Sequence, residues 1–168
     1  MRLGVNTVLF GGHDLRTAFE HIAWAGFEGA EISAIEGMCE HLVLDDWRSQ
    51  ADEVRTMSED LGLALTAMEV ATLDEGRLEK AFEAAAALGI PVVNVGPGGN
   101  AGDAADLDEA IAALSRRAER AAGYGVTLCV KAHVGKAIHN TPTTLEAMRR
   151  IDSPAFGIDM DPSHIHRA

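Results

Sequence analysis

Ala87-Leu88-Gly89-Ile90 ends a helical stretch in a glycine and begins an apolar strand pattern at once. A glycine adopts the left-handed conformation that ends a helix without steric cost, so a strand can follow directly. Three further junctions have the same form: Trp24-Ala25-Gly26-Phe27, Asp60-Leu61-Gly62-Leu63 and Gly123-Tyr124-Gly125-Val126. In chain order the four glycines lie 36, 27 and 36 residues apart, the length of one strand, one helix and their loops. Repeated units of this kind build a parallel sheet with helices outside.

The regular spacing favours an α/β fold of the (β/α) TIM-barrel type over an open sheet. Six strands are expected, at about Leu3–Leu9, Gly29–Ser33, Leu63–Val70, Pro91–Val95, Val126–His133 and Ala155–Met160. A complete barrel has about eight units, so we expect residues 1–168 to form one barrel domain that is truncated at its C-terminal end. Its first and last strands would lack neighbours, and because open strand edges pair with other chains, we expect self-association.

Composition and charge disfavour several classes of partner. The chain has 168 residues, of which 47% are hydrophobic and 24% charged, so it can bury a core. Its net charge of −12 disfavours nucleic acid, which is bound by neutralising phosphates with Lys and Arg, and equally an anionic membrane surface. No apolar run approaches the roughly 20 residues of a membrane span. The two cysteines, Cys39 and Cys129, form no CxxC or Cys/His cluster, which predicts a reducing, cytoplasmic location.

Polar residues at the ends of the predicted strands are the candidates for a functional site, because a barrel of this type carries its active site at the C-terminal strand ends. They are Asn6, Glu31, Glu69, Asn94, Lys131, His133, Asp159, Asp161 and His164. Strand alternation puts Asp159 and Asp161 on one face. Because an unpaired carboxylate is costly against the helix layer, both are expected to point to the barrel axis or its mouth. Glu31 and Glu69 contact substrate or pair with a neighbouring strand-end residue.

The spacing Asp161-x-x-His164 places a carboxylate at a strand end and an imidazole one turn later, over the same opening. Such a pair can hold a divalent cation and a substrate oxygen. In the alternative interpretation, Asp161 caps the turn before Pro162 and His164 is solvated.

Three segments resemble the xylose-isomerase-like TIM-barrel family: Arg2-Leu3-Gly4-Val5-Asn6, Ala25-Gly26-Phe27-Glu28-Gly29-Ala30-Glu31 and Gly157-Ile158-Asp159-Met160-Asp161-Pro162-Ser163-His164. The family includes sugar phosphate isomerases and epimerases, hydroxypyruvate-isomerase-like and inosose-dehydratase-like enzymes, and endonuclease IV. The resemblance implies a sugar or sugar-phosphate isomerase or epimerase that acts on a small polyhydroxylated carbonyl compound by metal-assisted proton transfer.

The resemblance also implies a divalent metal ion, Mn²⁺ or Mg²⁺, held by a Glu of strand five, an Asp of strand six, a His of strand seven and a Glu of strand eight. Asp161 matches the Asp as a metal ligand and catalytic residue, and His164 matches a histidine that contacts substrate. Further substrate contacts are expected from Asn6, Glu31, Glu69, Asn94 and His133. The chain departs from the pattern, since Lys131 holds the place of the strand-five Glu and only Asp161 remains of the four ligands.

Three interpretations of Lys131 stay open. Its ammonium forms a salt bridge with Asp161 or Asp159 and fills the place of the metal ion, it binds an anionic group of the substrate, or it forms a Schiff base with a carbonyl substrate as a catalytic residue. The departures also favour an alternative to the isomerase, a non-catalytic, metal-free ligand-binding remnant of the same fold. A third class, endonuclease-IV-like DNA repair, requires more His and Glu ligands and a basic groove, which the net charge disfavours.

Overall fold

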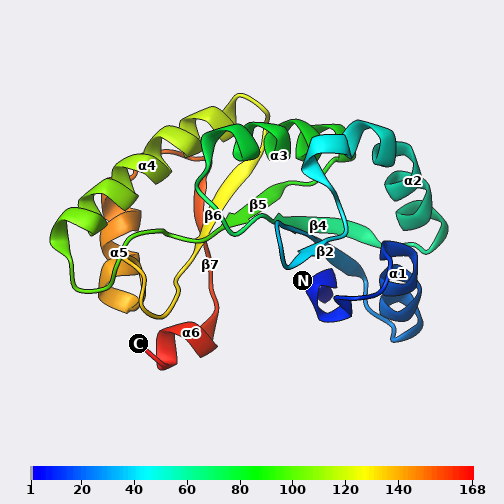
Figure 1. Cartoon of the computed structure of the whole chain (residues 1–168), viewed down its shortest axis with the longest axis horizontal. Coiled ribbons are helices and arrows are strands. Elements are labelled where there is room, and N and C mark those ends of the chain that lie inside the picture. Colours follow the sequence, from blue (N-terminus) through cyan, green and yellow to red (C-terminus); the bar gives the residue numbers. More distant parts are fainter. Residues whose placement is uncertain (1) are drawn as a thin grey trace.

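The computed structural model describes residues 2–168 and has a parallel sheet with helices along its outer side (Figure 1). Six strands lie in the order β1 (Gly4–Asn6), β2 (Gly29–Ile35), β4 (Ala64–Glu69), β5 (Val92–Val95), β6 (Thr127–Lys131) and β7 (Phe156–Asp159), and the short β3 (Cys39–Glu40) pairs antiparallel with β2. The helices are α1 (Leu15–Trp24), α2 (Trp47–Asp60), α3 (Glu75–Leu88), α4 (Ala104–Ala122), α5 (Thr141–Arg150) and α6 (Pro162–His166), with 3₁₀ turns at Thr7–Phe10 and Leu44–Asp46.

All four predicted junction glycines have the left-handed conformation. Their φ angles are 82° at Gly26, 66° at Gly62, 70° at Gly89 and 70° at Gly125. Each of the four ends a helical segment, and β2, β4, β5 and β6 begin within three residues of them. The repeated strand and helix units that these glycines predicted are therefore confirmed.

The first strand is shorter than predicted. It covers Gly4–Asn6, and a 3₁₀ turn at Thr7–Phe10 replaces the second half of the expected strand. The cause is the Asn6 side chain, whose Oδ1 accepts a hydrogen bond of 2.9 Å from the Val8 amide and so caps this turn. The prediction of a strand over Leu3–Leu9 is thus wrong in its second half.

The core lies between the helices and the outer face of the sheet. The fully buried side chains include Phe19 and Ile22 of α1, Met68 of β4, Phe82 of α3 and Leu114 of α4. Because side chains alternate along a strand, the apolar residues that meet the helices leave every second residue on the opposite, inner face. That inner face carries the polar groups of the candidate site.

The fold is a partial barrel, as predicted, because the strand pairing runs as an open path from β1 to β7. Within residues 2–168 these two strands pair on one side only. The apolar side chains Leu3, Leu9 and Met160 flank them and are exposed. None of the helices in the described chain is both long and apolar enough to cross a membrane.

Candidate functional site

The strand register gathers polar side chains on the inner face near the C-terminal strand ends. Paired positions of parallel strands face the same side. The register sets Asn6 beside Glu31, Glu69 beside Asn94, Asn94 beside Cys129, and Lys131 beside Asp159. The structure therefore brings together six of the predicted polar residues from six different strands.

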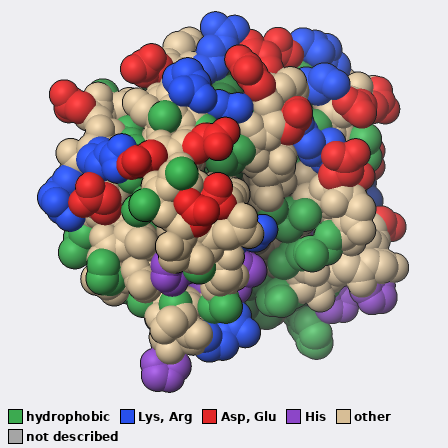
Figure 2. All heavy atoms as spheres, turned by 60° about the vertical axis from the view of Figure 1, so that its left-hand side comes forward, with side chains coloured by type: hydrophobic (Ala, Val, Ile, Leu, Met, Phe, Trp, Pro, Cys, Tyr) green, Lys and Arg blue, Asp and Glu red, His purple; other side chains and the backbone are tan. Residues whose placement is uncertain are grey.

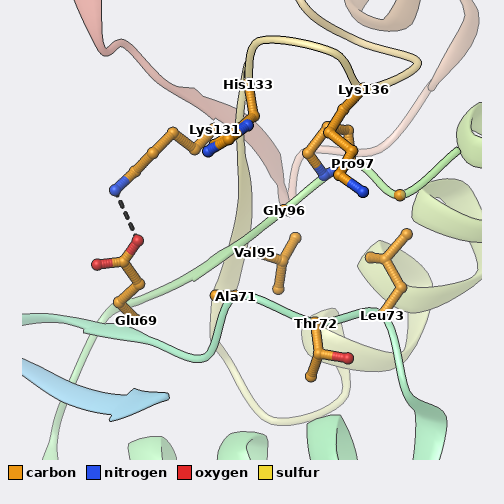
Figure 3. Close-up of a pocket in the computed structure, with 11 residues that line it drawn as sticks. Glu69, Ala71, Thr72, Leu73, Val95, Gly96, Pro97, Lys131, His133 and Lys136 are labelled. Carbon is orange, nitrogen blue, oxygen red and sulfur yellow. Dashed lines mark hydrogen bonds and ion pairs between the residues drawn. The ribbon is translucent and has the colours of Figure 1, made fainter. Parts of the chain in front are cut away.

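Lys131 and Glu69 form the central contact of this face. The Lys131 Nζ donates a hydrogen bond of 2.6 Å to Glu69 Oε1 (Figure 3). It also lies 3.5 Å from Asp159 Oδ2. The other carboxylate oxygen, Glu69 Oε2, accepts a hydrogen bond of 2.5 Å from Asn6 Nδ2. Of the predicted ion-pair partners, Asp159 is confirmed and Asp161 is wrong, while Glu69 was not expected in this role.

Glu31 and Asn94 form a second polar pair. Asn94 Nδ2 donates a hydrogen bond of 2.7 Å to Glu31 Oε1. The Asn94 side chain is buried, and its Oδ1 accepts no hydrogen bond from the described residues. An acceptor of this kind is costly to leave unpaired, and Asn94 lies behind the residues that line the cavity described below.

Burial and mutual charge shift the pKa values of these groups. Burial raises the pKa of Glu31, and the neighbouring Glu69 adds to this effect. Burial likewise raises the pKa of Asp159, although Lys131 opposes it. Burial acts to lower the pKa of Lys131, but the hydrogen bond and charge of Glu69 outweigh it and the net pKa is raised. Lys131 is therefore an ammonium at neutral pH. On the same face, burial together with the charge of Asp159 raises the pKa of the Cys129 thiol to about 11.

Replacing Glu31 with glutamine is expected to raise the melting temperature at pH 7 and to change it little near pH 4. A carboxyl group whose folded pKa is raised loses stabilising free energy as the pH rises from its unfolded pKa, about 4.3, through the folded value. Glutamine removes that loss and keeps an oxygen that accepts from Asn94. Thermal melts at both pH values measure the effect, with exposed Glu20→Gln as control. A lower melting temperature of E31Q at pH 7 would contradict the burial of this carboxylate.

A cavity of about 330 Å³ opens beside the Lys131–Glu69 pair. Its polar lining comes from Glu69, Thr72, Lys131, His133 and Lys136. The loops after β4 and β5 close its other sides (Figure 3). Ala71, in the loop after β4, has a positive φ of 56°. Every other non-glycine residue in the described part of the chain has a negative φ. A left-handed alanine is strained, and such residues gather at functional sites.

Lys136 is the charged residue of the cavity lining that the sequence did not reveal. It follows the β6 strand by a short loop and is exposed. Among residues 2–168 no carboxylate lies within ion-pair distance of its ammonium. The signal that pointed to it was weak: a lysine in a loop at a C-terminal strand end, without a motif.

Asp161 and His164 lie beyond the end of β7. Asp161 Oδ1 accepts hydrogen bonds from the Ser163 amide at 2.9 Å and the Ser163 hydroxyl at 2.6 Å, so it caps α6. The hydroxyl bond lowers the pKa of Asp161. The His164 ring packs on His133 with centroids 4.1 Å apart, and burial with the charge of His133 lowers its pKa. Asp161 acts as a cap, as the alternative interpretation expected, but that interpretation is wrong for His164, which is half-buried against His133 and not solvated. The roles of Asp161 as metal ligand and catalytic residue and of His164 as a substrate contact stay predictions.

The residues of this face do not fit a divalent metal ion. Across residues 2–168, no three His, Cys, Asp or Glu side chains form a group that holds one. Divalent Mg²⁺ and Mn²⁺ require several oxygen or nitrogen ligands. At the point where the Glu69 and Asp159 carboxylates converge, the chain places the Lys131 ammonium.

The comparisons with known proteins agree with this architecture. The family model described as "Xylose isomerase-like TIM barrel" matches residues 19–168. Similar solved structures include D-allulose 3-epimerase from Methylomonas sp. (19% identity, TM-score 0.77, 100% of this chain and 65% of that one). Another is a D-tagatose 3-epimerase-like protein (22%, 0.78, 98% and 66%). A third is a xylose isomerase-like TIM barrel protein from Mycobacterium smegmatis in complex with magnesium (18%, 0.77, 95% and 64%).

The chain thus spans just under two thirds of the length of these three structures. At identities of this size the likeness concerns the fold alone. No curated protein matches the chain. The family model, in contrast, covers most of the sequence, and the polar face lies where a barrel of this type carries its site. The chain therefore belongs to the xylose isomerase-like TIM-barrel family.

Proposed function

We propose that this chain belongs to a sugar or sugar-phosphate isomerase or epimerase-like protein that acts on a small polyhydroxylated carbonyl compound. The observation that carries the proposal is the Lys131–Glu69 pair, which borders a 330 Å³ cavity at the C-terminal strand ends. Aldose–ketose isomerisation and epimerisation next to a ketone both require a base and an electrophile at adjacent atoms. A carboxylate and an ammonium side by side supply these two groups.

In this proposal each residue has one task. Glu69 takes the proton from the carbon next to the carbonyl, as a general base. The Lys131 ammonium donates a hydrogen bond to the carbonyl oxygen, on which negative charge develops. Asn94 Nδ2 donates a hydrogen bond to Glu31 Oε1 and so fixes this neighbouring carboxyl group. Asn6 orients Glu69 through the bond of 2.5 Å.

The charged groups at the cavity indicate which class of sugar the protein would bind. His133 and Lys136 line its upper side, and the Gly96–Gly98 loop brings backbone close to the space between them (Figure 3). A phosphate or carboxylate group of the substrate suits these donors. The magnesium complex of the M. smegmatis protein supports a divalent ion elsewhere in the family. The residues described here do not fit one, so no step in this chain is assigned to a metal ion.

The surface charge and the open edges of the sheet bear on which macromolecules this chain would bind. In the face drawn in Figure 2, acidic and basic side chains are interspersed, and no continuous basic surface is visible. Together with the net charge of −12, this distribution of charge disfavours nucleic acid as a partner. Self-association through the β1 and β7 edges and a cytoplasmic location stay predictions, the latter resting on the two free cysteines.

Proton exchange with solvent tests the proposal. The protein is incubated in D₂O with a panel of keto sugars, aldoses and their phosphates, and deuterium at the carbon next to the carbonyl is followed by NMR. We expect incorporation into at least one phosphorylated or acidic member. Saturable binding of a sugar without incorporation would instead favour the second candidate, a non-catalytic ligand-binding protein. The same Lys131–Glu69 pair supports this second candidate, because the carboxylate and the ammonium neutralise each other's charge.

A further inference from the structure

Four charged side chains of the inner face form one electrostatic unit: Glu31, Glu69, Lys131 and Asp159. The Lys131 ammonium lies 2.6 Å from Glu69 and 3.5 Å from Asp159. All three side chains are largely buried: Lys131 is 21% exposed, Glu69 12% and Asp159 26%. Glu31 does not lie within ion-pair distance of Lys131, and its charge acts on the ammonium from further away. Two carboxylates, those of Glu69 and Asp159, thus contact one cation.

This arrangement depends on the cation at its centre. Carboxylates that are partly removed from water repel one another and are costly unless a positive charge lies between them. Lys131 supplies that charge from the chain itself, at the point where oxygens from β4 and β7 converge. An ion bound at this point would meet the ammonium at ion-pair distance, and like charges at this distance repel.

We propose that the Lys131 ammonium is a built-in cation that occupies a latent divalent-metal position, so that this site neither requires nor accepts such an ion. The corollary concerns position 131 itself. A glutamate there would face Glu69 and Asp159 and would provide the third carboxylate that the described chain lacks, which turns the same face into a metal site. The inference does not rest on the proposed activity, because ion binding is its readout.

Mn²⁺ binding to variants at position 131 tests this inference. Free Mn²⁺ is measured by electron paramagnetic resonance during titration of the wild type, K131E and K131M. The matched control is K136E, which introduces the same charge change at an exposed lysine of the same cavity. We expect K131E to bind one Mn²⁺ at least about 100-fold more tightly than the wild type, since repulsion is replaced by ligation. K136E should bind no better than the wild type, and K131M should lie between the two.

The test stays decisive if K131E folds poorly alone. In that case Mn²⁺ is expected to restore a cooperative thermal melt, and the double variant K131E/E69Q is expected to lose this effect. Tight binding of Mn²⁺ by the wild type would overturn the inference. So would a K131E protein that binds no better than K136E, or one that stays unfolded in millimolar Mn²⁺.

Discussion

Replacing Glu69 with glutamine is expected to lower the rate of proton exchange next to the substrate carbonyl by about 10²- to 10⁴-fold, the usual contribution of a general acid–base group. The amide keeps the size of the side chain and accepts a hydrogen bond from Lys131 through its oxygen. It has no basic oxygen for the proton, and it removes the charge that holds Lys131 in place. Deuterium incorporation at saturating substrate measures the effect on the turnover rate.

A matched variant separates this effect from a general loss of carboxylate charge. Glu79 of α3 lies on the helix layer and pairs with Arg120 and Tyr124, away from the cavity. E79Q should leave the exchange rate within about twofold of the wild type. If E69Q kept more than half of the wild-type rate while E79Q behaved as expected, Glu69 would not be the base.

Replacing Phe19 with alanine is expected to cost about 3–5 kcal/mol of unfolding free energy, because a buried aromatic ring is lost and a cavity is left behind. Phe19 lies on the buried face of helix α1 and is 0% exposed. Urea denaturation followed by circular dichroism measures the loss. A midpoint shift without a change in slope would identify it as a change in stability.

The control lies on the same helix. Trp24 of α1 is 85% exposed, so its replacement by alanine should change the unfolding free energy by only about 0.5 kcal/mol or less. Equal losses for F19A and W24A would show that α1 does not pack against the sheet as described.

The fold followed from local signals that act within a few residues. Gly26, Gly62, Gly89 and Gly125 fix the ends of helical segments by their own conformation, so their positions predicted the repeated units. The first strand was mispredicted because a single side-chain hydrogen bond from Asn6 ends it early. Hydrophobicity continues through Thr7–Phe10 and does not reveal such a cap.

The site was predicted less completely, because its contacts join residues far apart in the chain. Alternation predicted that Asp159 points to the inner face, and the strand register places it there beside Lys131. The partner of Lys131 depends on how β4 and β6 are placed across β5, and the sequence does not determine which of several carboxylates lies nearest. Asp161 matched a motif, yet the local hydrogen bonds to Ser163 and His164 take up one of its oxygens.

The protonation equilibrium of Lys131 most directly tests whether this residue is the built-in cation of the site. The chain has three lysines, Lys80, Lys131 and Lys136, so the side-chain signals of a lysine-labelled sample can be assigned with one variant each. We expect NMR titration to give Lys131 a pKa above the usual lysine value, because the hydrogen bond and charge of Glu69 outweigh burial, and a lower pKa in E69Q. A Lys131 pKa below the usual value in the wild type would contradict the ion pair and indicate a neutral, nucleophilic amine instead.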